Sequence, residues 1–186
     1  MKISIDNNNN LTLIHKLKNN EEYKVQRRKN IESLSILKNK INVKGYSNAT
    51  SNGGYIITLD YDNIAKYIVL EDAKYIQDKY KTTPFYLFST KEKNINGEII
   101  GNFHIVSLKN VDYRMFKEIL EDFRGDNSYK TMNIRNSFRS WVLRVSKKGK
   151  RNKPKFLNLL GKIKNLKEEI SEAHLILLEK LYNLPK

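Results

Sequence analysis

Asp60 and Asp62, two aspartates separated by one tyrosine, are the residues best suited to chemistry. They end an apolar, β-branched run, residues 54–60, that predicts a buried strand. Because side chains alternate along a strand, both carboxylates are expected on one face, where they would repel each other unless a cation lay between them. Hard oxygen ligands favour Mg²⁺ or Mn²⁺. The alternative is that both acids are solvent-facing residues at a strand end.

The next candidate is His104, which lies in the apolar run of residues 99–108. Alternation would place it on one face with Asn102 and Val106. In a split β-α-β-β arrangement the first and third strands are neighbours, so His104 would stand beside the aspartate pair. Two carboxylates and a histidine there could bind metal ions and the phosphates that those ions hold. A single histidine in a strand is otherwise most often structural.

A basic segment after these runs offers groups that bind phosphate. Arg144, Ser146 and Lys148 alternate along a strand expected at residues 141–146, and Lys147 is an alternative to Lys148. Guanidinium and ammonium groups in such a row can donate hydrogen bonds to phosphate oxygens. Basic residues on an edge strand also serve simply to prevent aggregation, so this reading stays open.

Asp126, in the sequence Gly-Asp-Asn before that strand, is a candidate third carboxylate. Near the aspartate pair it would add a ligand for divalent cations. The same three residues also form ordinary turns after helices.

The apolar patterns predict the elements that would position these side chains. Asn96-Gly97 is typical of a hairpin turn, Asn63 could cap a helix, and Gly125 would stop another. The expected fold class is α+β, with the order β-α-β-β-α-β and an antiparallel sheet whose helices cover one face. The strands are expected at residues 54–60, 85–90, 99–108, 129–134 and 141–146, and the second helix, over residues 111–124, would bury Phe116, Ile119, Leu120 and Phe123.

Helical additions are predicted on both sides of this central region, residues 51–153. Residues 1–50 would form a short strand, a loop at residues 7–10 and a helix over residues 21–41, all packed on the core. Residues 154–186 would form one long amphipathic helix that docks on its own domain and ends near Leu184.

The composition restricts the class of function. The chain has 186 residues, no cysteine and a net charge of +15. Without cysteine there are no disulfides, thiolate zinc sites, iron–sulfur clusters or cysteine nucleophiles. The excess charge lies in residues 1–50 (+6) and 111–153 (+7), whereas residues 51–110 are balanced, and a polyanion is the expected partner. No apolar run approaches the ~20 residues of a membrane span, so a cytoplasmic protein with no membrane partner is expected.

Taken in order, the sequences LDYD, FHIVSL, GDNSY and LRVSKKG resemble the archaeo-eukaryotic primase superfamily, particularly its small plasmid, viral and phage-type members. The resemblance covers residues 54–149 and implies an RNA-recognition-motif-like catalytic palm. One departure is Asn102, where the family commonly has a small or hydroxyl residue. Matched residue by residue, the resemblance implies that the metal ligands are Asp60, Asp62 and Asp126, the nucleotide contact is His104, and the triphosphate is held by Arg144 and Lys148, with Lys147 as an alternative. Ser146 joins this nucleotide-binding set through its place in the alternating row.

The resemblance implies template-directed nucleotidyl transfer, in which a 3′-hydroxyl attacks the α-phosphate of a nucleoside triphosphate and pyrophosphate leaves. The cofactors would be two Mg²⁺ or Mn²⁺ ions. The partners would be nucleoside triphosphates and a single-stranded or primed template of DNA or RNA, held by basic residues 24–29 and 139–153. Helicase or zinc-module activity would come from a separate chain, because the sequence has no P-loop and no cysteine.

Two other classes of function fit the same residues. A module that binds single-stranded nucleic acid without chemistry would keep binding after metal removal and after the double change Asp60→Ala, Asp62→Ala. A metal-dependent nuclease would degrade DNA or RNA without nucleoside triphosphates.

Overall fold

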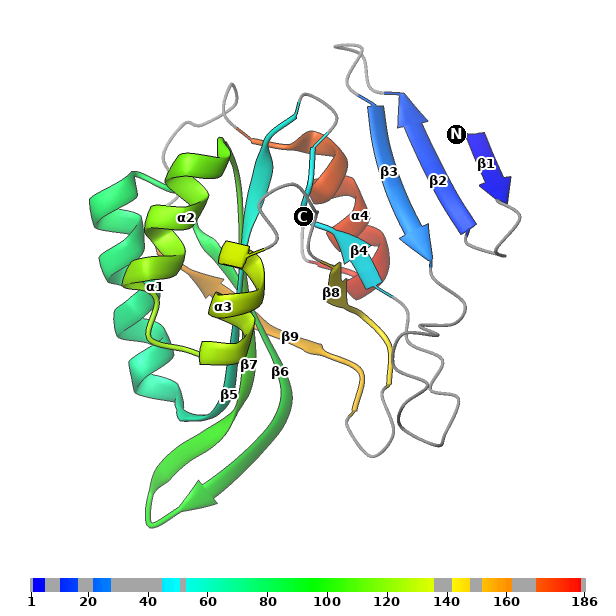
Figure 1. Ribbon diagram of the computed structural model, residues 1–186. Helices are drawn as coiled ribbons and strands as arrows, with labels where there is room; N and C mark the ends of the chain where they lie inside the picture. The colour runs from blue at the N-terminus through cyan, green and yellow to red at the C-terminus, as the bar shows by residue number, and fades with distance from the viewer. Residues whose placement is uncertain are drawn as a thin grey trace.

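The computed structural model (Figure 1) describes residues 2–5, 11–16, 22–27, 45–50, 53–135, 142–147, 152–161 and 170–184. These residues form an α+β fold whose sheets are antiparallel. The elements follow the order β1 (Lys2–Ile5), β2 (Leu11–Lys16), β3 (Glu22–Arg27), β4 (Gly45–Ser47), β5 (Tyr55–Ala65), α1 (Lys66–Tyr80), β6 (Phe85–Ile95), β7 (Glu98–Val111), α2 (Tyr113–Asp122), α3 (Asn127–Arg135), β8 (Val142–Arg144), β9 (Lys155–Leu160) and α4 (Glu172–Tyr182).

The central sheet contains four antiparallel strands in the order β5-β7-β6-β9. Strands β6 and β7 are joined by the predicted turn Asn96-Gly97, whose two residues have φ angles of 53° and 87°. Positive φ at both central residues is what a type I′ hairpin turn requires, so this prediction is confirmed. The prediction that the first and third strands of the central region are neighbours is also confirmed, since β5 pairs with β7.

Two apolar cores lie on opposite faces of this sheet. Alternate residues of β7 divide between them, so Phe103 and Ile105 belong to one core, and Val106 and Leu108 to the other. Helices α1 and α2 cover the first face, while α4 and the two-stranded sheet of β4 and β8 cover the second (Figure 1). Helices therefore cover both faces, whereas the sequence predicts them on one.

The two helices of the first face were predicted with different success. Helix α2 begins after Asp112, whose side chain accepts a hydrogen bond from the Met115 N–H at 2.8 Å. Helix α1 begins at Lys66 without a side-chain cap, so the prediction that Asn63 caps it is wrong. The stripe predicted for the second helix is buried and consists of Phe116, Ile119, Leu120 and Phe123.

Residues 129–134, predicted as a strand, lie in helix α3. Asp126 caps this helix, because its Oδ1 accepts hydrogen bonds from the N–H groups of Ser128 and Tyr129 at 2.6 and 3.1 Å. Tyr129 Oη also donates to the carbonyl oxygen of Thr58 at 2.5 Å, which docks α3 on edge strand β5. A capping residue and this edge contact thus override the strand-like local sequence.

The long helix predicted over residues 154–184 is wrong in its first part. Residues 155–160 form β9, and α4 begins only at Glu172. Strand β9 pairs with β6 and so supplies hydrogen bonds to an edge that would otherwise be open. Gly161, which follows the strand, has a φ of 95°. Apolar spacing alone does not distinguish a short strand from a helical turn. Here pairing with the open edge of β6 determines that residues 155–160 form a strand.

The N-terminal segment contains a three-stranded sheet of β1, β2 and β3. The predicted initial strand is confirmed as β1. The helix predicted over residues 21–41 is wrong at residues 22–27, which form β3, and residues 28–41 lie outside the described residues, as do residues 7–10. Among the described helices, none is long and apolar enough to cross a membrane.

Candidate functional site

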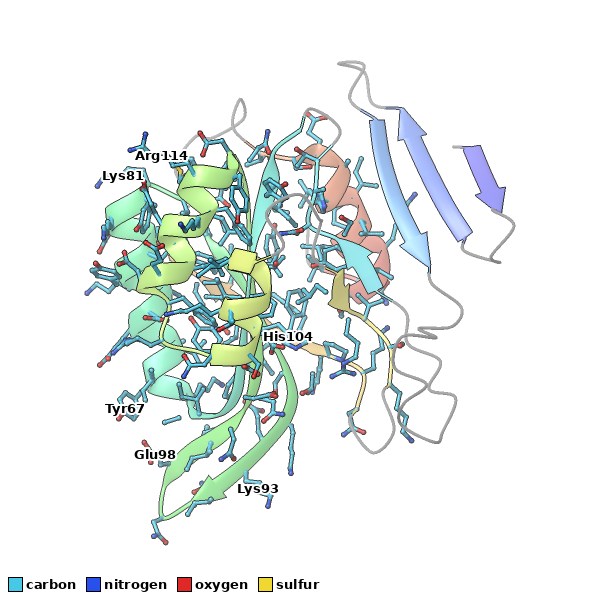
Figure 2. The ribbon with its side chains drawn as sticks, viewed as in Figure 1. Tyr67, Lys81, Lys93, Glu98, His104 and Arg114 are labelled. Atoms are coloured by element: carbon cyan, nitrogen blue, oxygen red, sulfur yellow. The ribbon has the colours of Figure 1, made fainter. Side chains whose placement is uncertain are left out.

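The centre of the candidate site is a contact between Asp60 on β5 and His104 on β7, which face each other across the two strands. Asp60 Oδ1 lies 3.2 Å from His104 Nε2. His104 is only 6% exposed, whereas 27% of the Asp60 side chain is exposed, so the aspartate forms the open side of the pair. Figure 2 labels His104 near the middle of the molecule. The sequence-predicted carboxylate and imidazole are therefore brought together.

Two polar atoms of this pair, Asp60 Oδ1 and His104 Nδ1, are buried without a hydrogen-bond partner among the described residues. The contact between Asp60 Oδ1 and His104 Nε2 is close enough for an ion pair but lacks hydrogen-bond geometry. An unpaired buried polar atom costs about 1–3 kcal/mol. Buried polar atoms that the protein leaves unpaired call for an explanation, and a bound water, ion or ligand is one.

A β-bulge separates Asp62 from Asp60. The register of β5 against β7 shifts at residues 61–64, and Asn63 within the shift has a φ of 54°. The Asn63 N–H donates to Asn102 Oδ1 at 2.9 Å, so Asn102 holds the bulge against the neighbouring strand. Asp62 is exposed there. The bulge interrupts the regular alternation from which a shared face was predicted, and Asp62 lies within it.

The backbone of Asp126 lies beside Asp60, as a third acid of the site would require. The Asp126 N–H donates to the carbonyl oxygen of Asp60 at 3.0 Å. A Cβ on the preceding residue, Gly125, would lie 2.6 Å from that same oxygen, so only glycine allows this close approach. However, Asp126 Oδ1 already caps α3. The structure therefore brings Asp126 to the site through its backbone.

Asp72 of α1 lies on the opposite face of the sheet and holds both strand β5 and the loop that contains Gly125. Its carboxylate accepts hydrogen bonds from Tyr61 Oη at 2.9 Å, from Arg124 Nε at 2.8 Å and from the Arg124 N–H at 3.0 Å. Burial, and after it the Asp72 charge, raises the pKa of Tyr61 well above its usual value. Since Tyr61 adjoins Asp60 and Arg124 adjoins Gly125, Asp72 keeps β5 and the loop before α3 together.

The predicted phosphate-binding residues lie on or after β8, a strand of three residues that pairs with β4 and not with the central sheet. Arg144 Nη1 donates to the carbonyl oxygens of Ser146 and, at 2.8 Å, Asn152. Arg144 thereby holds the segment between β8 and β9. Lys147 is exposed, and Lys148 lies outside the described residues. The predicted row of donors along one strand does not form over the described part of this segment.

A second buried histidine, His174 of α4, has both ring nitrogens paired. Its Nδ1 lies 2.8 Å from Ser171 Oγ, and its Nε2 lies 3.0 Å from the carbonyl oxygen of Ser47. A carbonyl only accepts, so Nε2 carries the proton and Nδ1 accepts from the Ser171 hydroxyl. Burial lowers the pKa of His174 from 6.5 to about 4, against the opposing effect of the Ser47 bond. His174 therefore joins α4 to β4 as a neutral side chain.

Asn102 and Tyr129 support the site although the sequence alone did not assign them that role. Asn102 had an available signal, because it lies two residues before His104 and so shares its face of β7. Tyr129 had none, because its contact with Thr58 joins residues 71 positions apart in the chain.

The carboxylate oxygens of Asp60 and Asp62 are of the type that a hard divalent cation prefers, although they do not form a complete cage. Within the described ranges, no group of three or more histidine, aspartate or glutamate side chains converges as a metal site. Mg²⁺ commonly binds one or two protein carboxylates and takes its other ligands from water and substrate phosphates. Asp60 and Asp62 are the residues that could supply such carboxylates.

Comparison of the chain with protein-family models, with curated proteins and with solved structures finds no match in any of the three. Function is therefore argued from the geometry and chemistry of the site itself.

Proposed function

We propose that the protein transfers nucleotides to a nucleic-acid strand, in the manner of a primase or polymerase. The observation that carries this proposal is the pair of Asp60 and His104, which leaves a carboxylate oxygen and an imidazole nitrogen buried and unpaired. These two groups suit a nucleoside triphosphate with its metal ion, the substrate that the primase resemblance implies. The net charge of +15 supports a nucleic-acid partner.

The order of the central elements supports a palm of the RNA-recognition-motif type. Strand β5, helix α1, strands β6 and β7 and helix α2 follow one another in the chain, and β7 lies between β5 and β6. In such a palm a fourth strand would pair with β5. Here α3 docks on β5 through Tyr129 and Thr58, so the proposed palm is a variant whose edge is covered by a helix.

Asp60 and Asp62 would hold Mg²⁺ or Mn²⁺ together with the phosphates of the nucleotide. When bound, the ion neutralises charge on the transferring phosphate and lowers the pKa of the attacking 3′-hydroxyl. We assign Asp126 a positioning role, because its N–H holds the Asp60 carbonyl while its carboxylate caps α3.

His104 would orient the triphosphate. Its Nδ1 would donate to a phosphate oxygen while Nε2 stays beside Asp60. Because His104 is 6% exposed, such a bond would form with little competition from water, which strengthens a charge-assisted hydrogen bond.

A second candidate is a module that binds single-stranded nucleic acid without chemistry. Two observations favour it: Asp126 Oδ1 is used as a helix cap, and the described residues contain no group of three metal-ligating side chains. In that case the basic residues would bind the strand, and Asp60 with His104 would have no catalytic part.

Extension of a primed template with nucleoside triphosphates and Mn²⁺ separates these functions. The substitution Asp60→Asn keeps the size of the side chain and removes its charge, so we expect extension to fall on the order of a thousandfold, or about 4 kcal/mol of transition-state stabilisation. Asp78→Asn, which alters an exposed aspartate of α1, is the matched control and should extend strands at the unmodified rate.

Other outcomes have distinct meanings. If the unmodified protein neither lengthens nor initiates a strand, nucleotidyl transfer is contradicted. Degradation of a labelled strand without triphosphates would indicate a nuclease. Binding without any product, unchanged after metal removal and in the double variant Asp60→Ala, Asp62→Ala, would indicate the non-catalytic module.

A further inference from the structure

The hairpin of β6 and β7 extends beyond the part of the sheet that the helices cover, and residues 91–99 form its projecting end, here named the arm. We propose that the arm binds the sugar-phosphate backbone of the nucleic-acid strand that passes the pair of Asp60 and His104. The path of the strand toward that pair rests on the proposed function, whereas binding by the arm can be measured without it.

The arm is open on both of its faces. Every residue from 91 to 99 is exposed, including Ile95 at 47% and Ile99 at 39%. In Figure 2, Lys93 and Glu98 lie on the arm, which projects beyond Tyr67 of α1. Two strands with no packed face are marginally stable in water, and exposed apolar residues on such an element are typical of an interaction surface.

The register of the arm directs its lysines to the face of the site. Lys91 lies opposite Asn102 and Lys93 lies opposite Ile100, while Phe88 lies opposite His104. Residues opposite each other share a face, and so do alternate residues along β7, so both lysines lie on the face that carries His104. A bulge between Ser89 and Lys91 produces this arrangement, because it shifts the alternation of β6 by one residue.

The charges of the arm are divided in a way that favours an anion near the site. Glu92 belongs to the other face by register and forms an ion pair with Lys66 of α1 at 3.5 Å. Glu98 lies next to the turn, at the far end of the arm. The two lysines thus make the site face positive at the end nearer His104.

Lysine ammonium groups on flexible stems suit phosphodiester groups, which require positive charge but no fixed orientation. Lys91 and Lys93 lie about 7 Å apart along the strand, so they can contact separate phosphates of one backbone. Continuing along β7 toward the site, such a backbone would reach Asn102 and then the exposed Asp60 side of the pair of Asp60 and His104. The chemistry recognises a nucleic-acid backbone and is independent of base sequence.

Fluorescence anisotropy of a labelled single-stranded oligonucleotide, without metal or triphosphates, tests this proposal. The double variant Lys91→Ala, Lys93→Ala should bind about tenfold more weakly, and the slope of log affinity against log salt should fall by about 1.4, because each phosphate contact on a single strand contributes about 0.7. The matched control is Lys74→Ala, Lys117→Ala, which removes the same charge from exposed positions on α1 and α2 and should weaken binding less than about twofold.

Equal weakening by the two double variants, or an unchanged salt slope in the arm variant, would overturn the proposal. The result is separable from the proposed activity. A protein that makes no product but loses binding in the arm variant would count against nucleotidyl transfer and in favour of the arm. A protein that makes product while the arm variant binds normally would support nucleotidyl transfer and count against binding by the arm.

Discussion

His104 and His174, two buried histidines among the described residues, lie in opposite chemical situations. His174 pairs both ring nitrogens, with the Ser171 hydroxyl and the Ser47 carbonyl. His104 lies beside Asp60 and leaves Nδ1 unpaired. Both are nearly inaccessible, with exposures of 0% and 6%, so burial does not separate them. The difference lies in hydrogen-bond satisfaction: His174 is paired within the protein, whereas His104 has a ring nitrogen that the proposed ligand would pair.

The surroundings of the two histidines agree with this division. His174 joins α4 to β4 across the second core, where its contacts are within the protein. His104 lies where a bulge, a glycine that allows close approach and the exposed side of Asp60 meet. Irregular backbone of this kind is costly, and proteins retain it where a site requires it.

The largest expected effect is on stability. His174→Ala and His104→Ala remove the same atoms from two buried positions, but only the first leaves a hydroxyl and a carbonyl without partners. We expect His174→Ala to lower the free energy of unfolding by about 3 kcal/mol, some 2 kcal/mol more than His104→Ala. Urea unfolding measures both values. Equal losses in the two variants would remove the distinction between the two histidines.

Lowering the pH should destabilise the folded protein through protonation of His174. Its pKa is about 4 in the folded protein and 6.5 when unfolded, so the unfolded chain binds the proton first as the pH falls. The stabilisation from keeping His174 neutral is complete above pH 6.5 and is lost as the pH falls toward 4. The free energy of unfolding should decrease by about 3 kcal/mol over that interval from this group.

The variant His174→Ala isolates this contribution, because other groups titrate equally in both proteins. The difference in unfolding free energy between unmodified protein and variant should be largest near neutral pH and small near pH 4. A difference that does not change with pH would show that His174 is not held neutral.

Much of the central region could be predicted from local signals. The turn Asn96-Gly97 requires two residues with positive φ, and the buried stripe of α2 repeats with helical spacing. The meeting of Asp60 with His104 could also be predicted, because it follows from which strands are neighbours. The turn and the helical stripe depend on residues that are close in the sequence. The meeting of Asp60 and His104 depends on the order of strands in the sheet, for which few alternatives exist.

The wrong predictions share a physical cause, which is that a distant part of the chain decides the local structure. Strand β9 forms because β6 offers an open edge, and α3 is fixed by Tyr129 on a strand far away in sequence. Asp126 caps α3, where the sequence predicts a third carboxylate or an ordinary turn.

Ring-nitrogen NMR of the histidines tests the central claim most directly. The chain has three histidines, so single substitutions at His104 and His174 assign their signals. Addition of a nucleoside triphosphate with Mg²⁺ should shift the Nδ1 resonance of His104 strongly and leave both resonances of His174 in place, because of these two histidines His104 is the one with a ring nitrogen that the described residues leave unpaired. An unchanged His104 spectrum at saturating triphosphate would contradict the assignment of Asp60 and His104 as the nucleotide site.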